Sequence, residues 1–413
     1  MKVIVSAYAC EPYKGSEPGI GWHFVNQMSK YHEVHVITRA NNRSVIEAEI
    51  GTEKKANLIF HYYDVPKVIS FWKKGRRGYQ LYYYLWQIFV YFKFKKFINK
   101  GDIDIVHHLT YGANWMPSLL MLTKPFGVWG PVGSEDIYKP VLKSLPIKVR
   151  LKELIRSAVK TFFYYIEPLR WLTVLKADVI LNHSSNYSHY SYPKWCQHKV
   201  RDHIQTGLNS SEPEYYGIKA IKEHKKKTRL IIASELVDWK GVVLAAEVFS
   251  EIASKRTDIE LVVLGEGTEK NKMKQIFLQY KVNEMVAFKG YVGKQELINE
   301  LYDADILLYP AYHHGLATII LQSMYSFLPI IAMDGDIISN VVHDKCGLSA
   351  SGDSMKQIKK TLIANTQRLI DDRGLRKKLA ITGREMVENT YEWELLILQM
   401  QSVYKQVELE LDH

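Results

Sequence analysis

Short apolar runs alternate with longer stretches of helical periodicity along the first half of the chain. The apolar runs cover residues 3–8, 34–38, 59–63, 103–108, 127–130 and 179–182. Each run is followed by polar or glycine-rich residues and then by a longer helical pattern, which predicts strands joined by helices. Strands connected in this way form a parallel sheet covered by helices. The first half is therefore predicted to be a doubly wound α/β domain.

The same rhythm restarts in the second half, with apolar runs at 229–233, 260–264, 285–289, 306–309 and 330–333. A polar stretch that ends in three consecutive lysines separates the two sets. We predict a Rossmann-like domain over 1–206, a linker over 207–228, and a second Rossmann-like domain over 229–413 whose last helix could return to the first. Two such domains would face each other across a cleft at the carboxyl ends of their strands, where ligands bind in such folds.

Length and composition agree with a two-domain globular protein, since the 413 residues are 47% hydrophobic and 24% charged. Cys10, Cys196 and Cys346 are far apart and odd in number, so no disulfide framework is expected. A reducing compartment, the cytoplasm, fits best. The opening residues read as a strand and not as a signal peptide. The uncharged, aromatic-rich run 79–92 is shorter than the roughly 20 residues of a membrane-spanning helix.

The net charge of +11 is concentrated in two segments of the first half. Residues 73–100 contain eight Lys and Arg and no acidic residue, and residues 143–160 contain six against one Glu. Both segments also carry many apolar or aromatic residues, a pattern typical of helices that lie on anionic lipid. The alternative is that these aromatic residues pack into the domain core and the lysines are solvated. No nucleic-acid-binding module accompanies the basic residues, so nucleic acid is not an expected partner.

The turn after the first predicted strand is rich in glycine. Glycines there let backbone amides approach a ligand, and a helix beginning near Gly19 would direct its positive end at phosphate or sugar hydroxyls. The spacing differs from the dinucleotide-binding pattern, so a nicotinamide cofactor is not expected. An ordinary tight turn is the alternative. The candidate residues of this loop are Gly15, Ser16, Glu17 and Gly19.

Two adjacent histidines, His107 and His108, end the fourth predicted strand of the first half. A neutral imidazole at the carboxyl end of a strand could hydrogen-bond a sugar hydroxyl or a reacting phosphate. Side chains alternate along a strand, so only one of the two can face a ligand. The other is expected to be a packed histidine.

In the second half, Lys240 follows the first strand and is placed to neutralise a diphosphate, although a solvated surface lysine is the alternative. Glu235 precedes it, and Gly265 closes the next strand. The loop after 306–309 leads into a helix whose amino end offers amides to an anion. No carboxylates or histidines show metal-ligand spacing, so neither a metal nor another cofactor is expected. The candidates of this donor loop are His313, His314, Gly315, Leu316, Ala317 and Gln322.

Several of these patterns occur together and in order. They are Ser-Ala-Tyr-Ala-Cys-Glu-Pro at 6–12, Gly-Ser-Glu-Pro-Gly at 15–19, His-His-Leu-Thr at 107–110 and Trp-Gly-Pro-Val-Gly at 129–133. On these motifs the chain resembles family 4 of the retaining glycosyltransferases, which have the GT-B fold, over nearly its whole length. The resemblance implies transfer of a sugar from a nucleotide diphosphate sugar, with retention at the anomeric carbon.

The resemblance also implies roles for individual residues. The loop 15–19 would approach the donor phosphates or the acceptor, His108 or alternatively His107 would touch the transferred sugar, and Lys240 would bind the diphosphate. The chain departs from the family where Glu235 replaces an arginine and where His314 and Gln322 replace acidic residues.

Two hypotheses remain open. In the first, the chain is an active enzyme that builds a polysaccharide or a lipid-linked glycan at the inner face of the cell membrane. In the second, it is a degenerate glycosyltransferase fold that acts as a binding or partner subunit for another protein.

Overall fold

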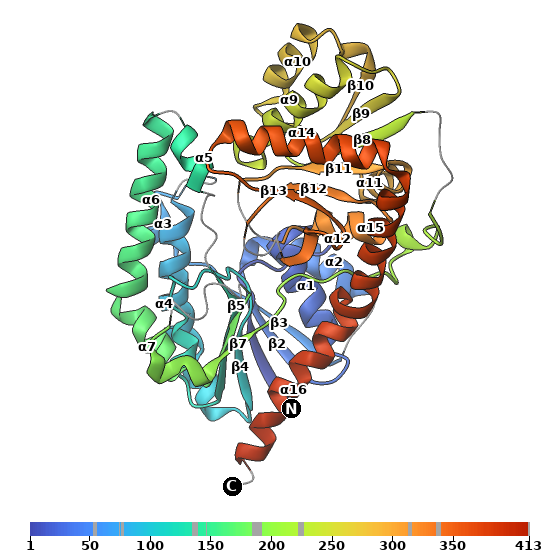
Figure 1. Ribbon diagram of the computed structural model, residues 1–413. Coiled ribbons are helices and arrows are strands. Elements are labelled where there is room, and N and C mark those ends of the chain that lie inside the picture. Colours follow the sequence, from blue (N-terminus) through green and yellow to red (C-terminus); the bar gives the residue numbers. More distant parts are fainter. Residues whose placement is uncertain are drawn as a thin grey trace. The chain divides into compact units, whose positions relative to one another are not determined.

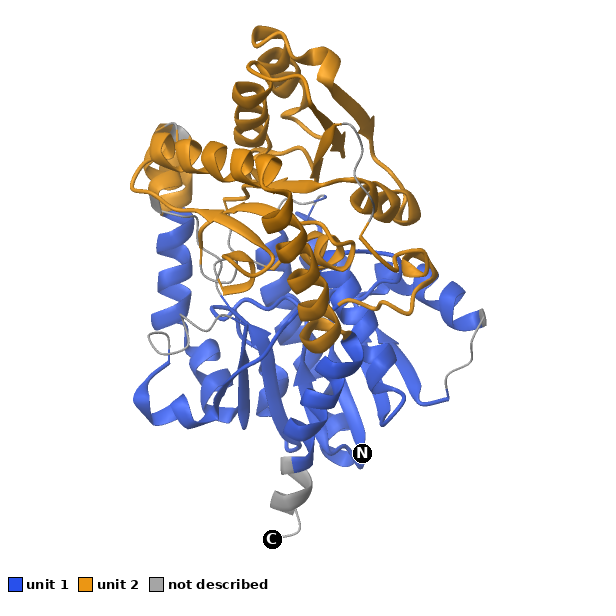
Figure 2. Cartoon of the chain, turned by 45° about the vertical axis from the view of Figure 1, so that its right-hand side comes forward, with its two compact units in different colours: residues 1–134, 155–207, 393–413 blue, residues 135–154, 208–392 orange. Residues whose placement is uncertain are grey.

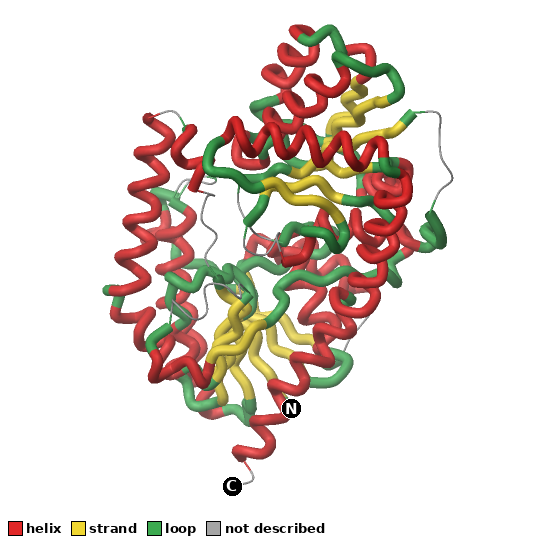
Figure 3. Tube along the Cα trace, viewed as in Figure 1, coloured by secondary structure: helices red, strands yellow, loops and turns green. Residues whose placement is uncertain are grey.

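A computed structural model describes residues 1–52, 56–73, 75, 78–133, 139–145, 147–183, 192–221, 227–312, 316–335 and 340–411. The chain forms two compact units, each coloured separately in Figure 2. Unit 1 comprises residues 1–134, 155–207 and 393–413, and unit 2 comprises residues 135–154 and 208–392. Each unit is built around one parallel sheet, drawn in yellow in Figure 3.

The sheet of unit 1 has seven strands in the order β3-β2-β1-β4-β5-β6-β7. Every neighbouring pair is parallel. The chain first adds strands on one side of β1 and then returns to add them on the other, so the order reverses between β1 and β4 (Figure 1). The strands are β1 Lys2–Ser6, β2 Glu33–Thr38, β3 Leu58–Tyr62, β4 Ile105–His108, β5 Phe126–Val132, β6 Val179–Asn182 and β7 Val200–Asp202.

Helices cover both faces of this sheet because consecutive strand residues point to opposite sides. Val3 and Val5 of β1 pack with α1 and α16, whereas Ile4 packs with α4. The helices that begin in unit 1 are α1 Ser16–Met28, α2 Arg43–Thr52, α3 Lys67–Ser70, α4 Tyr79–Lys100, α7 Pro168–Lys176 and α16 Trp393–Leu411. A further helix, α6 Ile147–Tyr165, has residues in both units.

The sheet of unit 2 has six strands in the order β10-β9-β8-β11-β12-β13, again with every neighbouring pair parallel. Its order reverses between β8 and β11. The strands are β8 Thr228–Ala233, β9 Ile259–Leu264, β10 Val286–Gly290, β11 Ile306–Tyr309, β12 Ile330–Met333 and β13 Gly347–Ala350.

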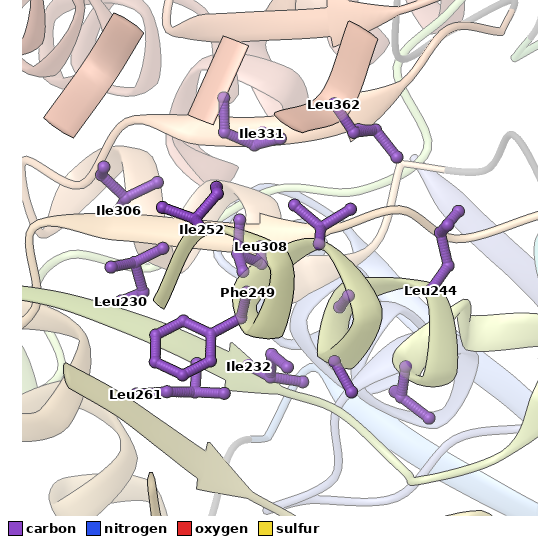
Figure 4. Close-up of a cluster of buried hydrophobic side chains, with 14 of the residues drawn as sticks. Leu230, Ile232, Leu244, Phe249, Ile252, Leu261, Ile306, Leu308, Ile331 and Leu362 are labelled. Atoms are coloured by element: carbon purple, nitrogen blue, oxygen red, sulfur yellow. The ribbon is translucent and has the colours of Figure 1, made fainter. Parts of the chain in front are cut away.

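A hydrophobic core on one face of this second sheet holds unit 2 together. Leu230 and Ile232 of β8, Leu308 of β11 and Phe249 of α9 meet there, as Figure 4 shows. Each of these side chains is at most 2% exposed, so the strand and the helix on either side of the β8–α9 turn are tightly packed together. The helices of unit 2 are α5 Lys139–Ser144, α9 Val242–Ala253, α10 Lys270–Gln279, α11 Lys294–Asp303, α12 Thr318–Tyr325, α14 Met355–Asp371 and α15 Arg373–Met386.

The predicted pair of doubly wound parallel sheets is confirmed, and two short edge strands were missed. β7 has the sequence Val-Arg-Asp and β13 has Gly-Leu-Ser-Ala, so neither forms an apolar run. The compact units also divide the chain differently from the predicted 1–206 and 229–413. Residues 135–154 belong to unit 2, and α16 packs on α1 in unit 1.

The stretch predicted as a linker, 207–228, is packed over much of its described length. Leu208, Tyr215 and Ile218 are buried, and Tyr215 makes an edge-on ring contact with Tyr325 of α12. Most of this stretch therefore forms part of unit 2.

Candidate functional site

Each sheet has one point at which its strand order reverses. In parallel α/β sheets, ligands bind outside the carboxyl ends of the strands at such a point. In unit 1 this point lies between β1 and β4, and in unit 2 between β8 and β11. Most of the sequence-predicted residues follow one of these four strands. The topology therefore gathers them into one group in each unit.

The turn after β1 brings its backbone very close to the helix that follows. Helix α1 begins at Ser16, three residues before the expected start, with Gly15 as a cap that makes no side-chain hydrogen bond. Gly19 lies inside this helix, and a β-carbon there would sit 2.1 Å from the backbone oxygen of Lys14. Only glycine fits that approach. Gly15 and Ser16 are exposed, so the uncapped amino end of α1 is accessible.

Glu17 connects this turn to the loop after β4. Its Oε1 accepts a hydrogen bond of 3.1 Å from the backbone N–H of Gly112. This contact joins the two segments that flank the reversal point of unit 1. Glu17 therefore positions the loop that follows the histidine pair.

His107 faces α1 and α16 and is completely buried. Its Nε2 donates to the backbone oxygen of Gly130 at 2.6 Å, and its Nδ1 accepts from the hydroxyl of Tyr404, also at 2.6 Å. Burial lowers the pKa of His107 to about 3, which keeps the ring neutral. Both ring nitrogens are engaged within unit 1, so His107 is a packed histidine.

His108 points to the opposite face, toward α4. The hydroxyl of Tyr83 lies 3.3 Å from its Nε2, and the ring of Tyr83 stacks on that of Tyr111 with centroids 3.7 Å apart. Burial lowers the pKa of His108 to about 4, with a smaller opposing effect from the Tyr111 backbone. His108 is 1% exposed, so a ligand would reach it only through movement of this aromatic layer.

Lys240 lies in the turn between β8 and α9 and is half-buried. Its Nζ donates to the hydroxyl of Tyr309, the last residue of β11, at 3.2 Å, and lies 4.4 Å from the ring centre of Trp239. Within the described part of the chain, no carboxylate forms an ion pair with Lys240. The ammonium is thus held in place by aromatic residues at the reversal point of unit 2, without a counter-ion from those residues.

Gly241 fixes the backbone beside this lysine. It adopts a φ of +67°, and a β-carbon there would lie 1.9 Å from the backbone oxygen of Pro310. The N–H of Tyr312 also donates to the backbone oxygen of Trp239 at 3.0 Å. The loops after β8 and β11 are therefore in direct contact.

Glu235 and Gly265 lie in the turns that follow β8 and β9. Glu235 is exposed and is not free of partners. Gly265 donates its N–H to the backbone oxygen of Gly290 at 2.7 Å, and Leu236 donates to the oxygen of Glu266 at 2.9 Å. The turns after β8, β9 and β10 are thus tied together by backbone hydrogen bonds.

The donor loop is described only in part, because His313, His314 and Gly315 lie outside the described residues. Leu316 and Ala317 are half-buried, and Ala317 caps α12 without a side-chain hydrogen bond. Gln322 is 8% exposed, and its side chain is hydrogen-bonded to the Tyr215 hydroxyl. Gln322 therefore has a partner within unit 2.

Sequence reasoning missed the aromatic residues that support these side chains. Tyr309 and Trp239 hold Lys240, and Tyr404 holds His107. A tyrosine as the last residue of an apolar strand was the available signal for Tyr309. Tyr404 is 297 positions from its partner, and no local pattern relates the two.

Over the described residues, no group of three or more His, Cys, Asp or Glu side chains could hold a metal ion. The search for helices long and apolar enough to cross a membrane likewise found none among them.

Comparison with known sequences gives matches mainly over the second half of the chain. Residues 218–386 match the family model described as Glycosyl transferases group 1. One relative is a GDP-mannose-dependent monoacylated alpha-(1-6)-phosphatidylinositol monomannoside mannosyltransferase of Corynebacterium glutamicum. It is 26% identical over 213 residues, which cover 48% of this chain and 54% of that protein. The chain spans about half the length of the curated relatives it matches.

Comparison with solved structures covers almost the whole chain and shows the fold. A sucrose-phosphate synthase from Thermosynechococcus elongatus superposes with a TM-score of 0.67 at 15% identity, covering 99% of both chains. The Anabaena protein HepE in complex with UDP superposes with a TM-score of 0.60 at 11% identity, covering 98% of this chain and 99% of the other. The fold is that of the GT-B glycosyltransferases.

Proposed function

We propose, on the premise that residues 218–386 belong to the glycosyl transferases group 1 family, that this chain is a glycosyltransferase. It moves a sugar, with retention, from a nucleotide diphosphate sugar to a polysaccharide or a lipid-linked glycan. The GT-B fold supports the use of such a donor, since one structure that shares the fold holds UDP. The Corynebacterium relative, named for a lipid-linked acceptor, supports the acceptor class.

The observation that carries this proposal is the placement of Lys240. A half-buried ammonium at the reversal point, without a counter-ion among the described residues, suits an incoming anion. Charge-assisted hydrogen bonds to phosphate oxygens are among the stronger polar contacts in proteins. The uncapped amino end of α12 follows the adjacent strand β11 and offers backbone amides to the same kind of ligand. We therefore place the donor diphosphate at Lys240.

The chemistry asks little of the protein beyond charge stabilisation and positioning. The bond between the anomeric carbon and the diphosphate oxygen breaks, and a bond from the acceptor oxygen to that carbon forms on the same face. The acceptor hydroxyl passes its proton to the departing diphosphate. Lys240 stabilises the negative charge that develops on this leaving group. No metal ion or other cofactor enters the proposed reaction.

The acceptor is assigned to unit 1, where His108 lies beneath the loop that Glu17 positions. A neutral His108 would hydrogen-bond the transferred sugar once the layer of Tyr83 and Tyr111 has moved. For a lipid-linked acceptor, we propose that the protein works peripherally at the inner face of the cell membrane.

Incubation of the purified chain with a panel of nucleotide sugars tests the proposal. We expect hydrolysis or transfer with at least one donor, and NMR of the product should show the anomeric configuration of that donor. Absence of turnover across the panel by the folded protein would contradict enzymatic activity. An inverted product would contradict retention alone.

A second candidate function is favoured by Glu235 and Gln322. An exposed carboxylate beside the proposed diphosphate site would repel the donor, and the Gln322 side chain is already bonded to Tyr215. The chain would then serve as a binding or partner subunit without catalysis of its own. That function predicts no affinity for nucleoside diphosphates even at millimolar concentration, together with loss of a partner enzyme's activity when this chain is absent.

A further inference from the structure

Helix α6 exposes a stripe of large apolar side chains. Ile147 is 83% exposed, Ile155 57% and Phe162 52%. At about 100° per residue, the exposed apolar positions fall within an arc of about 140° along a helix roughly 28 Å long. The large apolar side chains of this stripe are Ile147, Leu151, Leu154, Ile155, Val159, Phe162, Tyr165 and Ile166, the last lying just beyond the helix.

The stripe points away from the side by which the helix packs. Tyr164, near the end of α6, belongs to the core of unit 1, and at about 100° per residue it lies roughly opposite the centre of the stripe. Phe163 packs against the same core. Leu145, just before the helix, packs on the core of unit 2. The carboxyl end of α6 is thus anchored in unit 1 by a side of the helix that the stripe does not occupy.

Basic residues border the stripe on both sides. At about 100° per residue, Arg150 falls beside one edge, and Lys152 and Arg156 fall beside the other. All three are exposed, and Glu153 is the only acidic residue of the helix sequence. An apolar face between two basic margins is the arrangement by which a helix lies in a membrane interface, with its apolar side in the acyl boundary and its cations at anionic headgroups.

We infer that the stripe on α6 docks the protein on an anionic lipid surface. The inference builds on the proposed membrane location but not on the transfer chemistry, because lipid binding is measurable without donor or acceptor. It also distinguishes α6 from α4, the other basic segment. On α4 the residues Tyr82, Tyr83 and Trp86 are buried in the core of unit 1.

A second copy of the chain fits the stripe less well than lipid does. Two α6 helices packed face to face would bring the basic margins of both copies together, and such like-charge contacts oppose association. An anionic bilayer satisfies both margins and the apolar face at once. The charge pattern therefore favours lipid as the occupant.

Sedimentation of the full chain with vesicles tests the inference. One set contains phosphatidylglycerol and phosphatidylcholine, and the other contains phosphatidylcholine alone. We expect binding to the anionic vesicles that weakens with salt. The variant Ile155→Gln/Phe162→Gln should lose about tenfold or more in apparent affinity, because it removes two large side chains from the buried face. The matched control Leu278→Gln/Tyr291→Gln changes two exposed side chains of unit 2 and should bind as the parent does.

A fluorescence measurement locates the contact on the helix. The three native cysteines are buried, so an introduced cysteine can be labelled selectively. A polarity-sensitive dye at Val159→Cys, within the stripe, should enter an apolar environment when anionic vesicles are added. The same dye at Ser157→Cys, exposed but outside the stripe, should change much less.

Negligible pelleting with both vesicle types at low salt would overturn the inference. So would parent-like binding by the Ile155→Gln/Phe162→Gln variant, or equal dye responses at positions 157 and 159. If that variant altered only the oligomeric state seen by light scattering, the stripe would be an interface between copies. None of these measurements depends on transferase activity. The lipid-docking inference can therefore be disproved without disproving the proposed transfer reaction, and the reverse also holds.

Discussion

Lowering the pH from 7.5 to 5 should destabilise unit 1, because His107 and His108 are buried in their neutral forms. Burial lowers the pKa of His107 to about 3 and that of His108 to about 4, from 6.5 in the exposed group. Above about pH 6.5 both rings are neutral in the folded and the unfolded chain, and neither affects the pH dependence of stability. As the pH falls below 6.5, these histidines become protonated in the unfolded chain but stay neutral in the folded chain. The free energy of unfolding therefore decreases until the pH reaches the folded-state pKa values.

The size of the loss in stability follows from the difference between pH 5 and the pKa of a histidine in the unfolded chain. Each histidine lowers the free energy of unfolding by about 2 kcal/mol at pH 5, at roughly 1.4 kcal/mol per pKa unit. Together the two histidines contribute about 4 kcal/mol, a large part of the 5–15 kcal/mol that is typical of a domain. These two histidines should therefore lower the stability of unit 1 by about 3 kcal/mol per pH unit below about pH 6. His203 of the same unit adds to the slope, because burial lowers its pKa to about 4.

Urea unfolding at a series of pH values between 7.5 and 5 measures this slope. The variants His107→Gln and His108→Gln each remove one of these groups, so each should reduce the slope by about 1.4 kcal/mol per pH unit, whatever its stability at pH 7.5. His198→Gln removes an exposed imidazole of the same unit and serves as the matched control. A stability that does not change over this range, or a slope that both variants leave unchanged, would refute the assignment of neutral buried rings.

Three further outcomes follow from the candidate site. His108→Ala should lower turnover more than it weakens nucleotide binding, and a variant with full turnover would exclude a role for His108 at the sugar. Gly241→Ala should cost at least about 1–2 kcal/mol of stability, measured as a lower midpoint of thermal unfolding of unit 2, because a β-carbon cannot fit at that φ against Pro310. Removing divalent metals with EDTA should leave transfer unchanged, whereas loss of activity restored by one added metal would disprove a metal-free mechanism.

The two parallel sheets could be predicted because they depend on local patterns. Apolar runs such as 306–309 identify buried strands, and the βα alternation then determines that the strands are parallel. The two edge strands could not be found in this way. In β7 the polar residues Arg201 and Asp202 follow a single valine, and β13 lacks β-branched residues.

The sequence predicted which loops carry the candidate residues, but not which side chains those residues contact. Strand alternation predicts that the two histidines point to opposite faces of the sheet. The burial of both depends on residues from other elements, such as Tyr404 beside His107 and Tyr83 beside His108. The same holds for Lys240, whose position was expected but whose partner Tyr309 lies on another strand. Exposure of the α6 stripe also depends on tertiary packing, because the sequence of α4 carried a similar signal and yet its Tyr82, Tyr83 and Trp86 are buried in the core of unit 1.

Titration of UDP and of GDP into the parent protein and into Lys240→Ala tests the central claim most directly. Lys255→Ala removes an equally charged, exposed residue of the same unit and controls for net charge. We predict that one nucleotide binds the parent and the control alike, and that Lys240→Ala loses about 1.5–3 kcal/mol, a change of roughly 10- to 150-fold in Kd. Equal affinity in the parent and Lys240→Ala would contradict the placement of the donor diphosphate. Absence of binding of either nucleotide to the parent at millimolar concentration would contradict the glycosyltransferase function itself.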